Sequence, residues 1–282
     1  MRDFLVFQLY GPLVSWGGVA VGQIRHTETQ PTKSAIIGLI SAALGVRRDE
    51  EQRLRELADG YGFAVRTELS GVLERDFQTA EVPATTSLKG QPHRTRRDEV
   101  QAIRHGDNPV LSFREYRTDS LNFIALWQKE NAPYSLDSLA DALKYPHFQL
   151  YLGRKSCPLA LPLKPEKVSA NSLREVFSGF ENPELHPFLS HLCSEIIAKD
   201  RSVFWQWDVD FENSGFAQYL EVVRRDVPLS RKRWQFAERI ERQFVETPNN
   251  LGKKAVPEKT ETSSLTADLP LFAAKNKAGD NE

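Results

Sequence analysis

Residues 4–45 read FLVFQLYGPLVSWGGVAVGQIRHTETQPTKSAIIGLISAALG, and the order strand, loop, helix that they predict decides the fold. The first seven residues are an almost continuously apolar run closed by Gly-Pro, which predicts a buried strand. In the last part, apolar residues recur at helical spacing, Thr32 or Ser34 can cap the start, and Gly45 suits a left-handed C-terminal position. We expect a glycine-rich loop after the strand and a helix over about 33–45.

The pattern continues downstream with alternating strands and helices. Strands are predicted at 63–70, 71–79, 114–127 and 147–153, and a helix that Ser135 caps is predicted at 135–146. The tight Ser70-Gly71 junction predicts a hairpin between the first two of these strands. Residues 80–111 lack periodicity, which is typical of a functional or disordered loop. Apart from this insert and its returning strand, the order is the split βαβ arrangement of a ferredoxin-like domain, as in RNA-recognition modules.

The sequence therefore predicts an α+β protein. A ferredoxin-like domain is expected over 1–153, with the extended insert at 80–111, and a smaller second β-rich subdomain over 154–245. For that subdomain, WQWDVDF (205–211), AQYLEVVRR (217–225) and RWQFAERIERQF (233–244) predict strands, or strands and a helix. Residues 246–282 have little apolar content, which predicts a disordered tail.

Composition limits the class of protein. Of the 282 residues, 40% are hydrophobic, which is enough for a full core. Lys plus Arg (37) nearly equals Asp plus Glu (38), so only local charge patterning can indicate a polyanionic partner. The absence of a long apolar run and of a leader cleavage site predicts a cytoplasmic protein with no membrane partner. Cys157 and Cys193 form no CxxC, so we expect both to be reduced and structural.

Several enzyme motifs are excluded by their spacing. PTKSAIIG contains the Lys-Ser pair of a phosphate-binding loop but lacks its glycines, which argues against an NTPase. The glycines within 17–22 do not fit the dinucleotide-binding pattern. His186, His191 and Cys193 form the only cluster that resembles a metal site, but their spacing misses helical pairing and no fourth ligand is near. We therefore expect no cofactor and no metal.

Two clusters of basic residues stand out in a chain with almost no net charge. Residues 89–104, KGQPHRTRRDEVQAIR, carry five Lys or Arg and one His against two acids. The second cluster consists of Arg224, Arg225, Arg231, Lys232 and Arg233. Each cluster fits either a nucleic-acid contact or an ordinary solvated face.

A phosphate site is predicted at the start of the 33–45 helix. Lys33 and Ser34 lie in its first turn, where free N–H groups and the positive end of the helix dipole favour an anion. A lysine opposes this dipole, so its position makes sense if an anion binds there; a lysine extended into solvent is the alternative. Arg25 can supply a bidentate phosphate contact, and Trp16 can stack on an unpaired base or anchor the core.

A second phosphate-prone loop follows the strand expected at 147–153. Arg154, Lys155 and Ser156 come directly after a glycine at the end of that strand. Within the insert, the cations that could reach along a nucleic acid as an arm are Lys89, Arg94, Arg96 and Arg97. If about five such residues contact single-stranded RNA, affinity falls by roughly two orders of magnitude between about 50 and 200 mM salt.

Five separate motifs occur in one order along the chain. They are F-x-L-Y-G-P-L-x-S-W-G (7–17), R-x-T-x-x-x-P-T-K-S-A-I-I-G-L-I-x-A-A-L-G (25–45), D-F-Q-T (76–79), Y-L-G-R-K-S-C-P-L (151–159) and V-R-R-D-V-P-L-S-R-K-R-W-Q-F-A (223–237). This set resembles the CasD family, the fifth-type Cas subunit of the type I-E CRISPR surveillance complex, Cascade. The resemblance runs from residue 1 to about 245 and leaves out the tail.

The resemblance implies an RRM-like repeat-associated (RAMP) domain whose protruding thumb is the 80–111 insert. It implies a non-catalytic subunit that holds the 5′ handle of the CRISPR RNA and caps one end of the complex. Partners would be the CRISPR RNA and the backbone and large subunits of Cascade, with target DNA met only through the complex. Handle contacts would fall on Trp16, Gly17, Arg25, Lys33, Ser34, Arg154, Lys155 and Ser156, and thumb contacts on Lys89, Arg94, Arg96 and Arg97.

Two other functions stay open. A metal-independent endoribonuclease that processes precursor CRISPR RNA needs a positioned base, an acid and a cation. His26 is the best candidate base, ahead of His93 and His105. A protein scaffold whose basic patches face acidic neighbours is the third possibility, and it predicts no RNA affinity for the isolated chain. Incubation with precursor RNA in EDTA, together with His26→Ala, separates the enzyme from the binder.

Overall fold

The computed structural model describes residues 1–18, 20, 22–90, 94–103, 109–178 and 202–247. Within this part of the chain a nine-stranded sheet forms the body, in the order β10-β11-β9-β5-β7-β1-β8, with β3 and β6 also paired to β7. The strands are β1 (Arg2–Val14), β3 (Ile24–Arg25), β5 (Tyr61–Leu69), β6 (Val72–Ala80), β7 (Val110–Gln128), β8 (Glu166–Ala170), β9 (Val203–Asp208), β10 (Leu220–Ser230) and β11 (Gln235–Glu246). A separate two-stranded sheet pairs β2 (Trp16–Gly17) with β4 (Thr27–Glu28).

The apolar run at the N-terminus is a strand, as predicted, and it packs on both faces. Leu5, Phe7 and Leu9 of β1 point into one core cluster, whereas Phe4 and Val6 point into another. This alternation is what a strand requires when both of its faces are covered. The continuous apolar run therefore reports a strand at the centre of the fold.

Helices cover the face of the sheet to which Leu5, Phe7 and Leu9 point. They are α1 (Lys33–Ala43), α2 (Glu51–Gly60) and α5 (Leu136–Lys144), and their apolar residues share a cluster with β1 and β5. Thr32 caps α1 and Gly45 has a φ of 75°, as the sequence predicts, and Ser135 caps α5. The sequence prediction missed α2. On the other face α6 (Leu173–Ser178) packs against the second cluster.

The predicted hairpin between residues 63–70 and 71–79 is wrong. β5 and β6 do not pair with each other; both pair with β7, one after the other along its length. Gly71 has a φ of 73°, and a Cβ there would lie 2.2 Å from the carbonyl oxygen of Thr118. The glycine therefore allows a bend in one long ribbon instead of a chain reversal.

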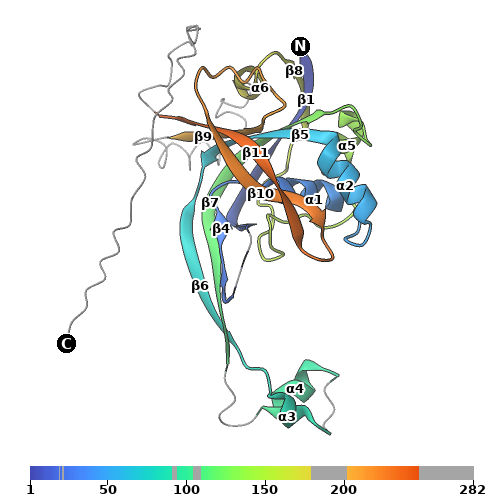
Figure 1. The fold of residues 1–282 in the computed structure, drawn as a ribbon, viewed down its shortest axis with the longest axis vertical. Helices are drawn as coiled ribbons and strands as arrows, with labels where there is room; N and C mark the ends of the chain where they lie inside the picture. The colour runs from blue at the N-terminus through green and yellow to red at the C-terminus, as the bar shows by residue number, and fades with distance from the viewer. Residues whose placement is uncertain (19, 21, 91–93, 104–108, 179–201, 248–282) are drawn as a thin grey trace, which may run out of the picture.

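This ribbon forms a projection from the body (Figure 1). β6 and β7 leave the sheet together, and α3 (Thr85–Leu88) and α4 (Arg96–Ala102) lie at the far end of the two strands. We call β6, β7 up to Thr118, and residues 81–90, 94–103 and 109 the thumb. The described parts of the insert predicted at 80–111 therefore lie at the tip of a stem that the sequence assigned to ordinary strands.

The strand predicted at 147–153 is also wrong. That segment forms only an isolated bridge between Tyr151 and Pro158, and the strand that pairs with β1 is β8. The chain makes a loop here because the backbone carbonyl of Leu152 accepts from Ser15, and the N–H of Leu152 donates to Cys157. Cys157 is a free, buried cysteine; Cys193 lies outside the described residues.

The strands after residue 200 join the same sheet as the N-terminal strands. β9 pairs with β5 on one side and with β11 on the other, and β10 is the outer strand. All three late segments are strands, so the alternative that one of them is a helix is wrong. The division of the chain at residue 153 stays a prediction, and the predicted tail lies almost entirely outside the described residues. Within the described part, no helix has the length and apolar content that crossing a bilayer requires.

Candidate nucleic-acid interface

The segment that contains Arg25 and the 153–156 loop meet on β7, where the thumb leaves the body. Arg154 donates to the backbone carbonyls of Glu115 and Arg25, each over 3.1 Å. Its guanidinium lies 4.8 Å from the ring centre of Tyr116. Arg154 therefore ties the 153–156 loop to both β7 and β3.

A close backbone approach fixes this loop. Gly153 has a φ of 88°, and a Cβ at this position would lie 1.8 Å from the carbonyl oxygen of Ser15. The hydroxyl of Ser15 in turn donates to the Glu115 carbonyl over 3.1 Å. Lys155 and Ser156 then extend into solvent from this anchored position, and Arg25 is exposed beside them. These exposed groups are the ones that a ribose-phosphate chain can reach.

Glu115 lies at the centre of a charged cluster that the sequence did not reveal. Its carboxylate accepts from Arg75 over 2.7 Å and lies 3.1 Å from Nδ1 of His26. The Glu115 side chain is buried, whereas His26 is 58% exposed and Arg75 is 53% exposed. Burial alone would raise the pKa of Glu115, but hydrogen bonds from Arg75, His26 and the Thr27 amide hold it below its usual value. The anion thus orients two exposed side chains toward solvent.

A hollow of about 410 Å³ opens between the thumb stem and the 153–156 loop. It is lined by Leu13, Glu74, Arg75, Asp76, Tyr116 and Ser156. Carboxylates repel a phosphate but accept hydrogen bonds from the amino groups of bases. The hollow therefore suits a base, while Lys155 and Arg25 suit the phosphates of the same strand.

The predicted phosphate site at the start of α1 is occupied by the protein itself. The amide of Lys33 donates to Asp226 over 2.7 Å, and its ammonium pairs with Asp208 over 3.0 Å. Lys33 and Ser34 are both buried, and the Ser34 hydroxyl lies 3.1 Å from that of Thr32. An anion does bind at this helix end, as the dipole argument requires, but it comes from β10. The prediction of RNA contacts at Lys33 and Ser34 is corrected accordingly.

Arg239 links the two aspartates behind α1. It donates to Asp226 over 2.7 Å and to Asp208 over 3.0 Å, and it also contacts Glu241. Burial alone would lower the pKa of Arg239, but the three carboxylates raise it. Burial raises the pKa of Glu241. This buried network joins β9, β10 and β11 to the first turn of α1 and is a structural element, because none of its charges faces solvent.

Trp16 and Gly17 are neighbours in the sequence, but Trp16 is buried and Gly17 is exposed. The indole of Trp16 is 1% exposed and belongs to the core cluster around β1, which fits the alternative of a core anchor. Stacking on a base would require this ring to leave the core. Gly17 is exposed, and a Cβ added to it would meet no atom within 4 Å. Only the glycine is therefore accessible to a ligand as the chain stands.

The predicted arm residues lie at the thumb tip, away from the 153–156 loop (Figure 1). Lys89, Arg94, Arg96 and Arg97 are all exposed. Arg96 is partly engaged, because it pairs with Glu99 over 2.9 Å and donates to the Glu81 carbonyl. His93 and His105 lie outside the described residues. The structure thus separates these predicted contacts into two sets. One lies where the thumb leaves the body, which we call the thumb base, and consists of Arg25, Arg154, Lys155 and Ser156; the other lies at the thumb tip and consists of Lys89, Arg94, Arg96 and Arg97.

Reasoning from sequence missed Arg75, Glu115 and Tyr116, which complete the thumb base. Arg75 and Glu115 are 40 residues apart and meet only because β6 and β7 pair in register. The D-F-Q-T motif at 76–79, directly after Arg75, was the available signal. It marks the stem strand, not the charged residue.

The sequence matches a known protein family over most of its length. The family model for CRISPR-associated protein (Cas_Cas5) matches residues 4–241. The CRISPR system Cascade subunit CasD of Escherichia coli (strain K12) is 31% identical over 64% of this chain and 78% of its own length. The chain belongs to the CRISPR-associated Cas5 family.

Solved structures agree with this Cas5 family fold. A chain of a CRISPR RNA-guided surveillance complex matches with a TM-score of 0.56 and 23% identity, over 86% of this chain and 89% of that one. A structure described as a Cas protein matches with a TM-score of 0.50 and 21% identity, over 90% of this chain and 100% of that one. At these identities the likeness concerns the fold. The large antiparallel sheet with few helices is thus the architecture of the Cas5 family.

Proposed function

We propose that this chain is a non-catalytic subunit of a type I-E Cascade complex that holds the 5′ handle of the guide RNA and caps one end of the assembly. Family membership and the likeness to the Escherichia coli Cascade subunit CasD support the assignment to such a complex. The observation that carries the RNA-binding role is the position of Arg154, which ties the 153–156 loop to β3 and β7. Through this contact, Arg25, Lys155 and Ser156 are exposed around one site.

The order of the central strands supports a ferredoxin-like RNA-binding module. β8, β1, β7 and β5 lie side by side, and each neighbouring pair is antiparallel. Helices α1 and α2 connect β1 to β5, and α5 lies between β7 and β8. This is the connectivity of the split βαβ motif, with the thumb inserted between its second and third strands.

The mode of binding follows from the charges at the thumb base. Phosphates lie against Arg25 and Lys155, which are exposed, and one base enters the hollow beside Tyr116 and Ser156. Single-stranded RNA is recognised through splayed bases and backbone charges, and this site offers contacts of both kinds. The thumb tip adds the predicted contacts of Lys89, Arg94, Arg96 and Arg97 to a more distant part of the RNA.

The remaining partners are those of a subunit within an assembly. Backbone and large subunits of Cascade would bind the surfaces that the RNA leaves free, and target DNA would be met only through the complex. Because guide RNA is an intracellular molecule, the cytoplasmic location predicted from the sequence is part of this proposal.

A binding assay with paired variants tests the proposal. The double change Arg154→Ala and Lys155→Ala should weaken binding of a labelled handle RNA at least about tenfold, because it removes one exposed cation and the side chain that holds the 153–156 loop in place. The matched control, Arg2→Ala with Lys144→Ala, removes two exposed cations elsewhere and should leave the affinity within about twofold. Equal affinity of both double variants would contradict RNA binding at the thumb base.

A metal-independent endoribonuclease is the second candidate, and one contact favours it. Glu115 holds Nδ1 of His26 at 3.1 Å, while the His26 side chain is 58% exposed. A histidine oriented by a carboxylate is a common general base. Cleavage of precursor RNA in EDTA by the wild type, and its loss in His26→Ala, would establish this function. Intact RNA together with unchanged handle binding by His26→Ala would leave only the binding role.

A further inference from the structure

The turn between β10 and β11 presents a tryptophan to solvent. We call residues 231–234 the Trp234 turn. The Trp234 side chain is exposed, with 60% of its surface accessible, and its φ is 52°. A bulky residue in the left-handed region costs free energy, and such strain clusters at ligand clamps. The fold thus keeps its only exposed tryptophan in a strained conformation on a turn; all five tryptophans lie in the described part of the chain.

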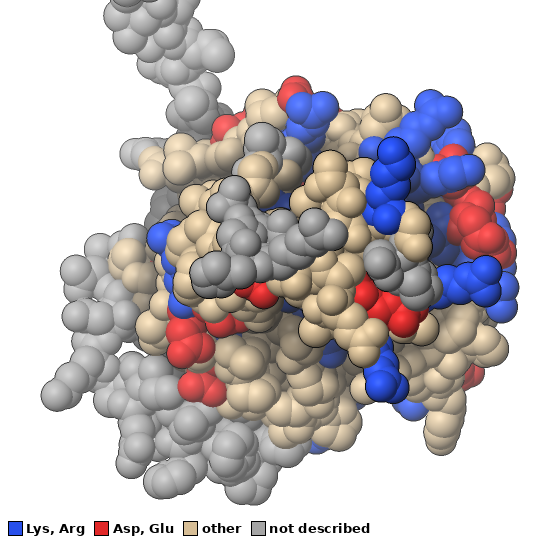
Figure 2. Space-filling view, turned by 90° about the horizontal axis from the view of Figure 1, so that it is seen from below, with Lys and Arg blue, Asp and Glu red and all other residues tan. Residues whose placement is uncertain are grey.

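One cation lies over the ring, and others are close to it in the sequence. The guanidinium of Arg48, from the loop between α1 and α2, lies 5.5 Å from the ring of Trp234. Arg47, Lys232 and Arg233 are exposed next to these two residues in the sequence. Seen from the end to which the thumb points, Lys and Arg gather toward one side of the molecule, with Asp and Glu among them (right in Figure 2).

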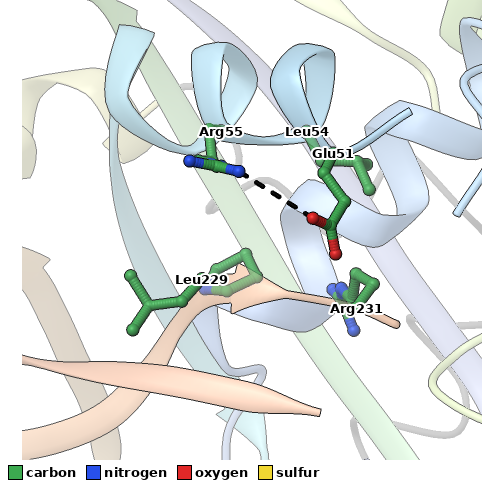
Figure 3. Close-up of a pocket in the computed structure, with 6 residues that line it drawn as sticks. Glu51, Leu54, Arg55, Leu229 and Arg231 are labelled. Carbon is green, nitrogen blue, oxygen red and sulfur yellow. Dashed lines mark ion pairs between the residues drawn. The ribbon is translucent and has the colours of Figure 1, made fainter. Parts of the chain in front are cut away.

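The turn is held rigidly against the helices beneath it. Arg231 donates to the backbone carbonyl of Ser34, and the Ser230 hydroxyl donates to Glu51. Figure 3 shows Arg231 and Leu229 facing Glu51 and Arg55 of α2. The ring is therefore presented by a fixed platform, which lowers the entropy lost when a ligand binds.

Two nearby acids, Glu50 and Glu51, are engaged by their own partners. Glu51 accepts from Ser230, and this bond holds the pKa of Glu51 below its usual value. Glu50 accepts from the Arg47 amide and pairs with Arg53 over 2.6 Å, which lowers its pKa. Asp49, next to Arg48, is exposed as well, and Arg47, Arg48, Lys232 and Arg233 outnumber it at the tip of the turn.

We propose that the Trp234 turn is a second contact for single-stranded nucleic acid, in which a base stacks on Trp234 and phosphates lie against Lys232, Arg233 and Arg47. An exposed aromatic ring among cations is how proteins bind single strands without sequence preference. No residue of this contact belongs to the thumb base, so the two sites stand or fall separately.

A protein partner fits this surface less well. Aromatic hot spots in protein interfaces are fully desolvated and usually pair with a pocket. The hollow between α2 and β10 is lined by Glu51, Leu54, Arg55, Pro228, Leu229 and Arg231, so Trp234 itself lies outside it. Stacking of a base on an exposed ring needs no pocket, and every base has a face that can stack.

The tryptophans provide a direct readout. Trp16, Trp127, Trp205 and Trp207 are buried, so a quencher in solvent reaches Trp234 first. Titration of the full-length protein with a short oligouridylate should quench its intrinsic fluorescence and protect the remaining emission from iodide. The Trp234→Phe variant should bind with similar affinity, because the phenylalanine ring still stacks. It should show no quenching, because the accessible tryptophan is gone.

Two further variants separate stacking from charge. Trp234→Gly removes the ring and accepts the positive φ without strain, so it should fold normally and bind about tenfold more weakly. Lys232→Ala with Arg233→Ala should reduce the slope of log affinity against log salt by about 1.4. Unfolding by urea confirms that each variant is folded before binding is compared.

The outcomes distinguish the partners and the two sites. Quenching that persists in Arg154→Ala with Lys155→Ala supports an independent contact, whatever those changes do to handle binding. Oligouridylate binding without any change in Trp234 emission overturns the proposal and leaves the thumb-base site untouched. Equal quenching by polyglutamate overturns it in favour of an acidic protein partner.

Discussion

The backbone amide of Lys33 donates to the carboxylate of Asp226, 193 residues further along the chain, over 2.7 Å. This bond places an internal anion at the N-terminus of α1, where the helix dipole favours negative charge. The Lys33 ammonium then pairs with Asp208, so β9 and β10 both close on the same helix end. The late strands are therefore locked to the first helix by charges that no solvent screens.

Lys33→Met should destabilise the fold without affecting RNA binding. Removal of the Lys33 ammonium takes away one buried partner of Asp208 and leaves Arg239 as the other, and it should cost about 2 kcal/mol of unfolding free energy, measured by urea denaturation. Handle RNA affinity, measured where the variant is folded, should stay at the wild-type value. Asp210→Asn is the control, because it breaks a more exposed pair with Lys129 and should cost less than about 1 kcal/mol. Weakened RNA binding by folded Lys33→Met would restore the predicted phosphate site.

Glu115 should stabilise the protein at neutral pH and lose this effect in acid. Its pKa is lower in the folded chain than the ordinary 4.5, so the stability is complete above that value and declines as the pH falls through the folded pKa. The difference in unfolding free energy between wild type and Glu115→Gln should therefore shrink below about pH 4.5. Arg75→Ala should raise the Glu115 pKa, as followed by carboxyl NMR titration. A difference that stays constant with pH would refute the assigned network.

Tyr61 should resist ionisation at alkaline pH. Its hydroxyl donates to the Tyr134 carbonyl, and burial raises its pKa from 10.0 to about 12. The raised value means that stability is complete below about pH 10 and is lost as the pH rises toward about 12. Phenolate absorbance should show a late step that is missing in Tyr61→Phe, and that variant should lose about 1 kcal/mol of stability. Titration of all tyrosines in one step near the ordinary value would show that Tyr61 is not buried as described.

Gly71→Ala should disturb the thumb stem. The new Cβ would lie 2.2 Å from the Thr118 carbonyl oxygen, at a φ that already disfavours a side chain. We expect a loss of more than about 2 kcal/mol and faster amide exchange along β6. Gly90→Ala is the matched control, since it has a similar φ of 76° but open space, and it should cost about 1 kcal/mol. Equal losses in the two variants would show that the close approach to Thr118 does not matter.

Local patterns predicted the parts of the fold that depend on neighbouring residues. The helical spacing of 33–45, its Thr32 cap and its Gly45 end, and the Ser135 cap are confirmed because caps and periodicity act within one or two turns. The hairpin at Ser70-Gly71 was wrong because a glycine at positive φ fits both a turn and a bend in a continuing strand. The choice is made by β7, which lies far away in the sequence.

The candidate site could be predicted only in part for the same reason. Arg25 and Lys155 are exposed, as a contact with RNA requires, but their contact with RNA stays a prediction. Lys33 was misassigned, because the anion that it binds comes from a strand near the other end of the chain. Glu115 gave no signal, since a single acid in a strand is informative only once its partners from β4 and β6 are known.

The most direct test of the account is a crosslink map of guide RNA to this chain within the assembled complex. Photoreactive uridines are placed in the 5′ handle, and the crosslinked peptides are identified by mass spectrometry. We expect crosslinks in the peptides that contain Arg25 and residues 153–156. Handle crosslinks confined to other surfaces, such as α5 or β8, with none at the thumb base, would contradict it.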